Sequence, residues 1–203
     1  STSANSTEIY HEGLVLPPVK MTAEGVYDED LERLILTNSR QPELVRGDIR
    51  AQIAATEIGV QRMQDHCVRF GIETVMDSFA AILKAAADEM QAAITALPDG
   101  QASAEGYMDD DGVEMDKGVY FAVTITKQGD DIEFDFSNSQ AQAKGPINLR
   151  PSMVEACVFY SLIGCLGHNM QFNDGMRDAV KFKYAPRTIT NAESPAPVSS
   201  YQK

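Results

Sequence analysis

A run of acidic residues at positions 109–112, Asp-Asp-Asp-Gly, has the carboxylates and the glycine with which a calcium-binding loop begins. Such a loop supplies further oxygen ligands at later positions, and this sequence lacks them. The run therefore favours a solvated acidic turn over a metal site.

The three histidines, His11, His66 and His168, are scattered along the chain, and none has a second histidine at the spacing of a metal-binding pair. His11 lies between Glu8 and Glu12 and is the best candidate ligand among them. A surface histidine is the simpler interpretation of His11. The sequence thus predicts no metal site within this chain.

A polar group, Asp48, Arg50 and Gln52, lies near the start of a predicted long helix. Positions 48 and 52 share a helix face beside the apolar stripe, so these two side chains could point into a cleft with Arg50 on a neighbouring side. The alternative is a hydrogen-bonded polar edge that fixes helix packing. The sequence has no Gly-rich phosphate loop of the nucleotide-binding kind and no G-x-S-x-G nucleophile motif, so these residues do not by themselves name a reaction.

Acidic residues outnumber basic ones by 30 to 17, which gives the chain a formal net charge of −13. Nucleic-acid binding needs a basic surface, so the composition argues against a nucleic-acid partner. No apolar run approaches the roughly 20 residues of a membrane-spanning helix. The longest candidate is interrupted by Ser161 and Gly164. We expect neither nucleic acid nor a membrane as a partner.

Cys67, Cys157 and Cys165 are the cysteines of the chain. The last two share a predicted helix and lie about 12 Å apart along its axis, too far for a disulfide. We expect reduced thiols in the core of a cytoplasmic protein. The chain begins at Ser1 without an initiator Met or an apolar signal core, which indicates a segment of a longer polypeptide.

Residues 1–100 are predicted to form an extended N-terminal segment followed by helices. Asp28 is a candidate N-cap for a short first helix. Apolar residues then recur at helical spacing over residues 43–70 and again over residues 72–97. We expect these two long helices to pack against each other as an antiparallel pair.

Residues 101–203 are predicted to form a mostly antiparallel sheet with one buried helix. Alternating apolar residues predict strands at 102–108, 119–126, 132–136 and 180–184. Pro151 opens a helix that is apolar on nearly every side, so we expect this helix to be buried. The predicted fold class is α+β.

Four motifs occur in an order that resembles the hydantoinase B family. They are residues 6–14 (STEIYHEGL) with Pro17-Pro18, residues 47–52 (GDIRAQ), residues 107–112 (YMDDDG), and the stretch from Asp135 through Gln142 and Gly145 to Asn148. That family includes the B subunits of ATP-dependent hydantoinases and the matching half of 5-oxoprolinase, and it is related more distantly to acetone and acetophenone carboxylase subunits. Its members are several hundred residues long, so the chain looks like their middle portion.

The resemblance implies a two-component enzyme that hydrolyses a small cyclic amide. An actin-like A-type subunit would bind ATP, and phosphorylation of the amide oxygen would make the ring carbon electrophilic. The B-type subunit would host attack by water, which needs a base and hydrogen-bond donors for the developing charge. The family's metal-binding region, rich in His and Asp, would lie before Ser1, so the ligands of a divalent metal would lie outside this chain.

The candidate site residues follow from the same resemblance. Glu8, Glu12 and Arg50 are the candidate catalytic residues, the carboxylates as an acid or base and Arg50 as an anion contact. The candidate substrate-binding residues are Asp48, Gln52, Asp135, Gln142 and Asn148. A structural role is the alternative for each of them.

Two departures from the family pattern affect the loop after Asp135. Asn138 stands where the family usually has Gly, and Gly145-Pro146 replaces a common Gly-Asn. Asn tolerates a left-handed conformation, but Pro146 removes a backbone N–H donor.

Two other functions remain open at this point. One is ATP-dependent, biotin-independent ketone carboxylation, although residues 8–13 look closer to the hydantoinase and oxoprolinase branch. The other is a non-catalytic scaffold that docks the ATP-binding subunit.

Overall fold

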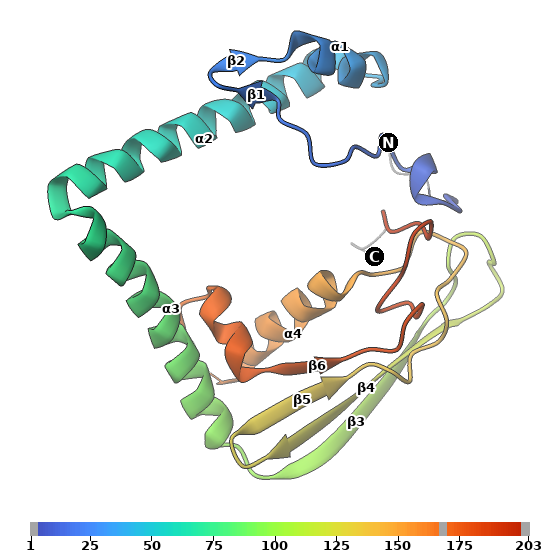
Figure 1. Cartoon of the computed structure of the whole chain (residues 1–203). Coiled ribbons are helices and arrows are strands. Elements are labelled where there is room, and N and C mark those ends of the chain that lie inside the picture. The colour runs from blue at the N-terminus through green and yellow to red at the C-terminus, as the bar shows by residue number, and fades with distance from the viewer. Residues whose placement is uncertain (1–3, 167–169, 200–203) are drawn as a thin grey trace. The chain divides into compact units, whose positions relative to one another are not determined.

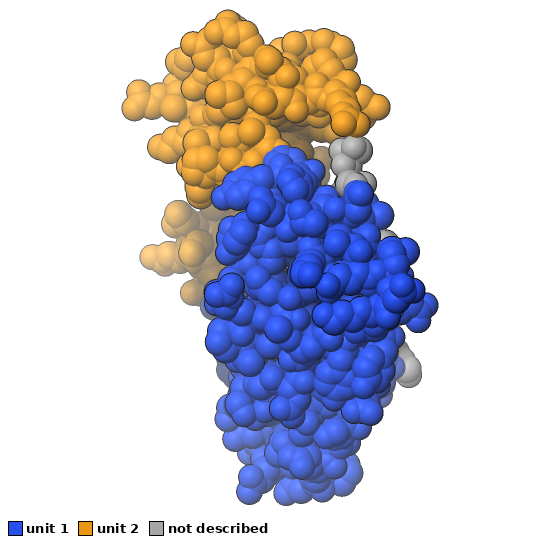
Figure 2. Space-filling model, turned by 90° about the vertical axis from the view of Figure 1, so that its right-hand side faces the viewer, with its two compact units in different colours: residues 1–13, 80–203 blue, residues 14–79 orange. Residues whose placement is uncertain are grey.

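The computed structural model describes residues 4–166 and 170–199 of the chain. The chain divides into two compact units (Figure 2): residues 1–13 and 80–203 form unit 1, and residues 14–79 form unit 2. The boundary between the units falls within a helix, between Phe79 and Ala80. His168 lies outside the described residues.

Unit 1 is built on a four-stranded sheet with the strand order β3-β4-β5-β6 (Figure 1). The strands are β3 (Gly100–Met108), β4 (Val119–Gln128), β5 (Asp131–Asp135) and β6 (Lys181–Lys183). Neighbouring strands are antiparallel except β5 and β6, which run parallel. The alternation predicted for residues 132–136 is confirmed, since Ile132 and Phe134 are buried. The sheet is thus mostly antiparallel, as predicted.

The core of unit 1 lies between the sheet and its helices. The C-terminal part of α3 (Ile72–Thr95), α4 (Pro151–Leu166) and the short 3-10 helix η2 (Asp174–Ala179) supply its other apolar side chains. Met90 and Ile94 of α3 are completely buried there, next to Phe159 of α4. Burial of several large side chains gives unit 1 a hydrophobic core of its own.

Only one side of α4 is buried, which corrects the prediction for this helix. Val158 and Leu162 face the core, whereas Tyr160 is 82% exposed. Cys157 and Cys165 are also exposed, so the prediction of core thiols is wrong for both. A helix that is apolar all round is normally buried, but α4 lies at the surface of unit 1 and can turn only one face to the sheet.

Unit 2 contains a small hairpin and the remaining helices. Its elements are β1 (Thr22–Ala23), β2 (Val26–Tyr27), α1 (Glu29–Thr37), α2 (Pro42–Phe70) and the first residues of α3. Asp28 caps α1 as predicted, since its carboxylate accepts the Leu31 N–H at 2.9 Å. Of residues 14–79, all of which the structure describes, only Glu32 and Leu36 are buried.

The predicted antiparallel packing of α2 and α3 is not confirmed. Apolar side chains that such packing would cover, including Met63 of α2 and Phe79 of α3, are exposed. Two antiparallel helices need a connection of about two to five residues, whereas Gly71 alone separates α2 from α3.

Candidate functional site

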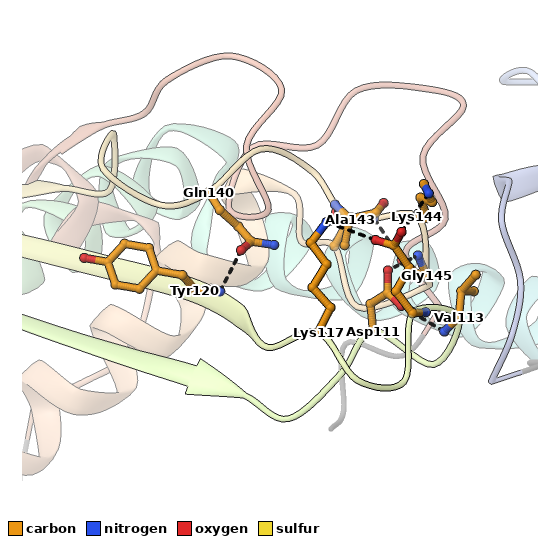
Figure 3. Close-up of polar contacts among 10 residues, drawn as sticks. Asp111, Val113, Lys117, Tyr120, Gln140, Ala143, Lys144 and Gly145 are labelled. Carbon is orange, nitrogen blue, oxygen red and sulfur yellow. Dashed lines mark hydrogen bonds and ion pairs between the residues drawn. The ribbon is translucent and has the colours of Figure 1, made fainter.

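The most heavily engaged carboxylate of unit 1 belongs to Asp111, in the turn after β3. Its side chain is almost fully buried, and one oxygen accepts the backbone N–H groups of Val113 at 2.8 Å and Glu114 at 2.6 Å. The other oxygen accepts the N–H of Gly145 at 2.9 Å, which lies in the loop after β5 (Figure 3). The prediction of a solvated acidic turn is therefore wrong for Asp111.

These bonds also set the charge state of Asp111. Burial by itself would raise the pKa of the carboxyl, but the backbone N–H groups that point at it, led by those of Glu114 and Gly145, outweigh burial and lower the pKa. Asp111 is thus an ionised anchor that joins two loops, and its oxygens are occupied by the protein.

Gly145 is required where the two loops touch. A Cβ atom built on Gly145 would lie 1.7 Å from the backbone oxygen of Asp111, which no side chain can tolerate. Gly112 is required for a second reason, because its φ of +84° lies in the left-handed region. Motifs 107–112 and 135–148 of the sequence therefore meet at one backbone contact.

Asn148 holds the same loop from inside and is completely buried. Its side-chain oxygen accepts the Ala143 N–H at 2.7 Å. Its amide nitrogen donates to the backbone oxygens of Ala143, Gly145 and Pro197 at 2.9 to 3.0 Å. Both ends of the side-chain amide are thus engaged within the protein.

A cavity of about 270 Å³ lies beside this contact. It is lined by Asp111, Glu114, Lys117, Val119, Gln140, Ala141, Gln142, Ala143 and Lys144. Glu114 accepts a hydrogen bond from the Lys144 ammonium at 2.7 Å and one from the Lys117 ammonium at 3.2 Å. The Lys144 bond, followed by the Lys117 bond, lowers the pKa of Glu114, and the same pairing raises the pKa of Lys144.

Two glutamines complete the polar lining of the cavity. The side-chain oxygen of Gln140 accepts the Tyr120 N–H at 2.9 Å (Figure 3). The side-chain oxygen of Gln142 accepts the Glu193 N–H at 3.1 Å. Their amide NH₂ groups have no protein partner within the described part of the chain. The cavity thus presents ammonium and amide donors together with the carboxylate of Glu114 and the backbone-bound carboxylate of Asp111. Its donors suit a ligand that carries carbonyl or carboxylate oxygens.

Asp135, a predicted substrate-binding residue, braces the end of β5. Its carboxylate accepts the Ser137 N–H at 2.8 Å and a hydrogen bond from the Lys183 ammonium at 2.7 Å. Burial would raise the pKa of Asp135, but the bonds from Lys183 and Ser137 outweigh burial and lower the pKa to about 2. Of the predicted substrate-binding residues, Gln142 lines the cavity, Asn148 supports its wall, and Asp135 lies at the start of the loop.

The predicted acid/base residues lie in the N-terminal segment of unit 1 and do not line the cavity. Glu12 accepts the backbone N–H groups of Val198 and Ser199, each at 2.9 Å, so it fastens this segment to the C-terminal part of unit 1. Glu8 is exposed, and its carboxylate has no protein partner in residues 4–166 and 170–199. The structure therefore leaves only Glu8 of this pair available to a ligand.

The remaining predicted residues belong to unit 2. The Arg50 side chain lies 3.4 Å from the buried carboxylate of Glu32, which Arg46 approaches to 3.8 Å. Asp48 and Gln52 are exposed. Arg50 thus neutralises a buried charge within its own unit.

Sequence reasoning missed Glu114, Lys117 and Lys144. The contact of Lys144 with Glu114 joins segments 30 residues apart, which no local pattern reveals. The only available signal was the pairing of the 107–112 motif with the 135–148 motif. Within residues 4–166 and 170–199, no three His, Cys, Asp or Glu side chains form a group that could hold a metal ion, and no helix there combines the length and apolar character that a membrane crossing needs.

Comparisons with known proteins cover nearly the whole chain. The family model described as hydantoinase B/oxoprolinase matches residues 1–203. The putative B-type component of the D-/L-hydantoinase of Pseudomonas sp. (strain NS671) is 30% identical, over 95% of this chain and 34% of that protein. The acetophenone carboxylase delta subunit of Aromatoleum aromaticum is 22% identical, over 96% of this chain and 29% of that protein.

A solved structure supports the fold directly. The crystal structure of the ATP-dependent caprolactamase from Pseudomonas jessenii matches with a TM-score of 0.86 at 28% identity. The match covers 96% of this chain and 33% of the caprolactamase chain. The chain thus spans about a third of the length of the relatives that it matches.

Proposed function

Since the chain belongs to the hydantoinase B/oxoprolinase family, we propose that it is part of a B-type subunit that opens the ring of a small cyclic amide in an ATP-dependent reaction. The family match over residues 1–203 is the observation that carries this proposal. A hydantoinase subunit and an ATP-dependent caprolactamase, each matching at least 95% of the chain, support it.

ATP would be bound by an A-type partner subunit and would supply the phosphoryl group that activates the amide oxygen. This assignment agrees with the sequence, which has no Gly-rich phosphate loop of the nucleotide-binding kind. A metal ion does not fit the described residues, because no three ligating side chains come together there. The steps proposed for this chain therefore involve its own side chains alone.

The ring-opening step needs a base for water and donors for the carbonyl oxygen. Glu8 is the proposed base, because its exposed carboxylate has no protein partner among the described residues. Glu12 would hold the Glu8 segment through the backbone of Val198 and Ser199.

A second candidate function is ATP-dependent carboxylation of a ketone. The match to the acetophenone carboxylase delta subunit favours it, although that protein is less similar to this chain than the hydantoinase subunit is. A third candidate is a scaffold that docks the ATP-binding subunit. The engagement of Glu12, Asp135 and Asn148 by the protein itself favours a structural role for these three residues.

The decisive experiment is an assay of the full-length subunit produced together with its A-type partner. Hydantoin, 5-oxoproline, caprolactam and acetophenone would each be tested with and without ATP and bicarbonate. We expect ring opening of at least one cyclic amide that depends on ATP and not on bicarbonate. Carbon dioxide fixation into acetophenone without amide hydrolysis would replace this proposal by the carboxylase.

The scaffold alternative has its own test in the same assay. The triple variant Glu8→Gln, Glu12→Gln, Arg50→Met should lose most of the activity if this segment takes part in the reaction. Full activity of the triple variant would establish the scaffold role. The assembly of the variant with its partner, measured by size-exclusion chromatography, separates lost chemistry from lost docking.

A further inference from the structure

The cavity beside Asp111 differs in charge from the rest of the chain. Four titratable side chains line it: Asp111, Glu114, Lys117 and Lys144. Asp111 is ionised, but backbone N–H groups hold its oxygens, so Glu114 is the carboxylate that the two ammonium groups contact. The chain as a whole carries a net charge of −13. The two ammonium groups balance the two carboxylates of the lining, so the cavity is locally neutral in an acidic protein and repels an anionic ligand less than the rest of the surface does.

The donors of the cavity outnumber the acceptors that the protein offers them. Each ammonium group has three N–H donors, and the contact with Glu114 uses one of them. The amide groups of Gln140 and Gln142 are oriented by backbone donors that hold their oxygens, which leaves their NH₂ groups as the free ends. A carboxylate, which accepts up to four hydrogen bonds, would satisfy such a set of donors.

The cavity is also small and firmly supported. Its volume of about 270 Å³ lies just below the range of about 300 to 1,000 Å³ typical of pockets for drug-sized ligands, so a compact molecule is the expected occupant. Its walls are fixed by the Asp111–Gly145 bond and by the buried Asn148 side chain. A preformed site of this kind loses little free energy to ordering when a ligand binds.

We propose that this cavity binds the carboxylate of a small amino or amido acid, the class of product that hydrolysis of a cyclic amide releases. Lys117 and Lys144 would hold the carboxylate, and Glu114 would accept the N–H of the amine or amide at the other end. This inference rests on the proposed function for the identity of the ligand, but the charge and donor pattern stand without it.

The chemistry of ring opening accounts for both ends of this ligand. Water adds to the activated amide carbon and the C–N bond breaks, so the nitrogen takes a proton. A second water then releases the phosphoryl group as inorganic phosphate and leaves the carbon as a carboxylic acid. The acid is ionised near neutral pH, which produces a carboxylate and an N–H group in one molecule. The cyclic substrate carries no charge at that carbon, so the two lysines would favour the product over the substrate at this site.

The test is a binding titration of the full-length subunit without ATP, measured by calorimetry or NMR. The probes are 6-aminohexanoate and N-carbamoylglycine, with acetate and inorganic phosphate as simpler anions. We expect the two product-like acids to bind more tightly than acetate. Binding of phosphate in preference to every carboxylate would overturn the assignment and indicate a phosphate site.

Lysine variants locate the binding. The changes Lys117→Met and Lys144→Met affect side chains that are 69% and 68% exposed, so the fold should tolerate them. We expect each to weaken binding about threefold to fivefold, and both together by more than about tenfold. Lys84→Met is the matched control, because Lys84 is similarly exposed and also forms an ion pair, with Asp88. Equal losses in all three variants, or no loss in the first two, would overturn the proposal.

The change Glu114→Gln should alter which acids the cavity prefers, which a purely structural role of Glu114 would not predict. It removes the carboxylate that competes for both ammonium groups, so we expect acetate to bind more tightly than in the unchanged protein. The advantage of 6-aminohexanoate over acetate should shrink, because its ammonium end loses its partner. Weaker acetate binding would count against the proposal. If the unchanged protein binds the product-like acids as expected but the assembled enzyme shows no ATP-dependent ring opening, the proposed function is contradicted and the binding site is not.

Discussion

Unit 1 and unit 2 contain similar apolar patterns but use them differently. In unit 1 the C-terminal part of the α3 stripe is buried, with Met90 and Ile94 completely inside. In unit 2 the 29-residue helix α2 has no buried residue, although Val60 and Met63 belong to a stripe of the same spacing. A helical stripe therefore identifies a face that can pack, but not whether the chain itself supplies the surface that covers it.

The two units also differ in how closely their buried polar side chains are held. In unit 1, Asp111 and Asn148 are held by backbone hydrogen bonds of 2.6 to 3.0 Å. In unit 2, the buried Glu32 relies on two arginines at 3.4 and 3.8 Å. The cavity lies where the polar network is tightest, which is a reason to look for function in unit 1 first.

The largest effect that would test this contrast is expected for Gly145→Ala. The added methyl group would meet the Asp111 backbone oxygen at 1.7 Å, so the two loops must separate. We expect the free energy of unfolding to fall by more than about 4 kcal/mol. Urea denaturation of the chain measures this change.

Gly164→Ala is the matched control for that variant, because nothing lies within 4 Å of the position on α4. Alanine is the better helix former, so we expect this control to be neutral or to stabilise the chain by up to about 1 kcal/mol. Similar stabilities for the two variants would show that the Asp111–Gly145 contact is not essential to unit 1.

Asn148→Ala should have the next largest effect. The change leaves the Ala143 N–H and several backbone oxygens without a partner inside the protein, at a cost of about 3 kcal/mol. Asn191→Ala removes a single bond of 3.2 Å to Ala185 and should cost about 1 kcal/mol. Thermal unfolding of both variants checks the ranking, which a larger loss for Asn191→Ala would reverse.

Particular residues show which structural features a single sequence predicts and which it does not. Asp28 before α1 is a local signal that gave the correct start of that helix, and the helical spacing over residues 43–70 gave the ends of α2 to within one residue. The alternation around Phe134 likewise predicted a strand with the correct buried face. Local chemistry decides these features, so a single sequence suffices for them.

The contacts that build the cavity depend on distant residues. Asp111 looks solvated in its acidic run, and only the approach of Gly145, 34 residues later, makes it a buried anchor. The pairing of Lys144 with Glu114 has the same cause. The predicted packing of α2 on α3, which is not confirmed, depended on an apolar pattern that does not say which surface covers it.

A moderate effect is expected when the pH falls. The pKa of Asp135 is lowered to about 2, so its contribution to stability is complete above the unfolded value of 3.8 and is lost as the pH drops toward 2. We expect that contribution to be about 2 kcal/mol. Asp135→Asn should remove it, so the difference in unfolding free energy between the two proteins should narrow from pH 6 to acid. An unchanged difference would contradict the Lys183 and Ser137 bonds as its source.

The smallest effect is expected for Met63→Ala in α2, and it bears most directly on the contrast between the units. The same substitution at Met90 removes a fully buried side chain and should cost about 2 to 5 kcal/mol. Met63 is 41% exposed, so its replacement should change the free energy of unfolding by less than about 0.5 kcal/mol. Because both changes replace Met by Ala within a helix, the comparison isolates burial. A loss above about 1 kcal/mol for Met63→Ala in the 203-residue chain would mean that α2 is covered within that chain. If Met63→Ala lowers the free energy of unfolding only in the full-length enzyme assembled with its partner, the surface that covers α2 belongs to that assembly.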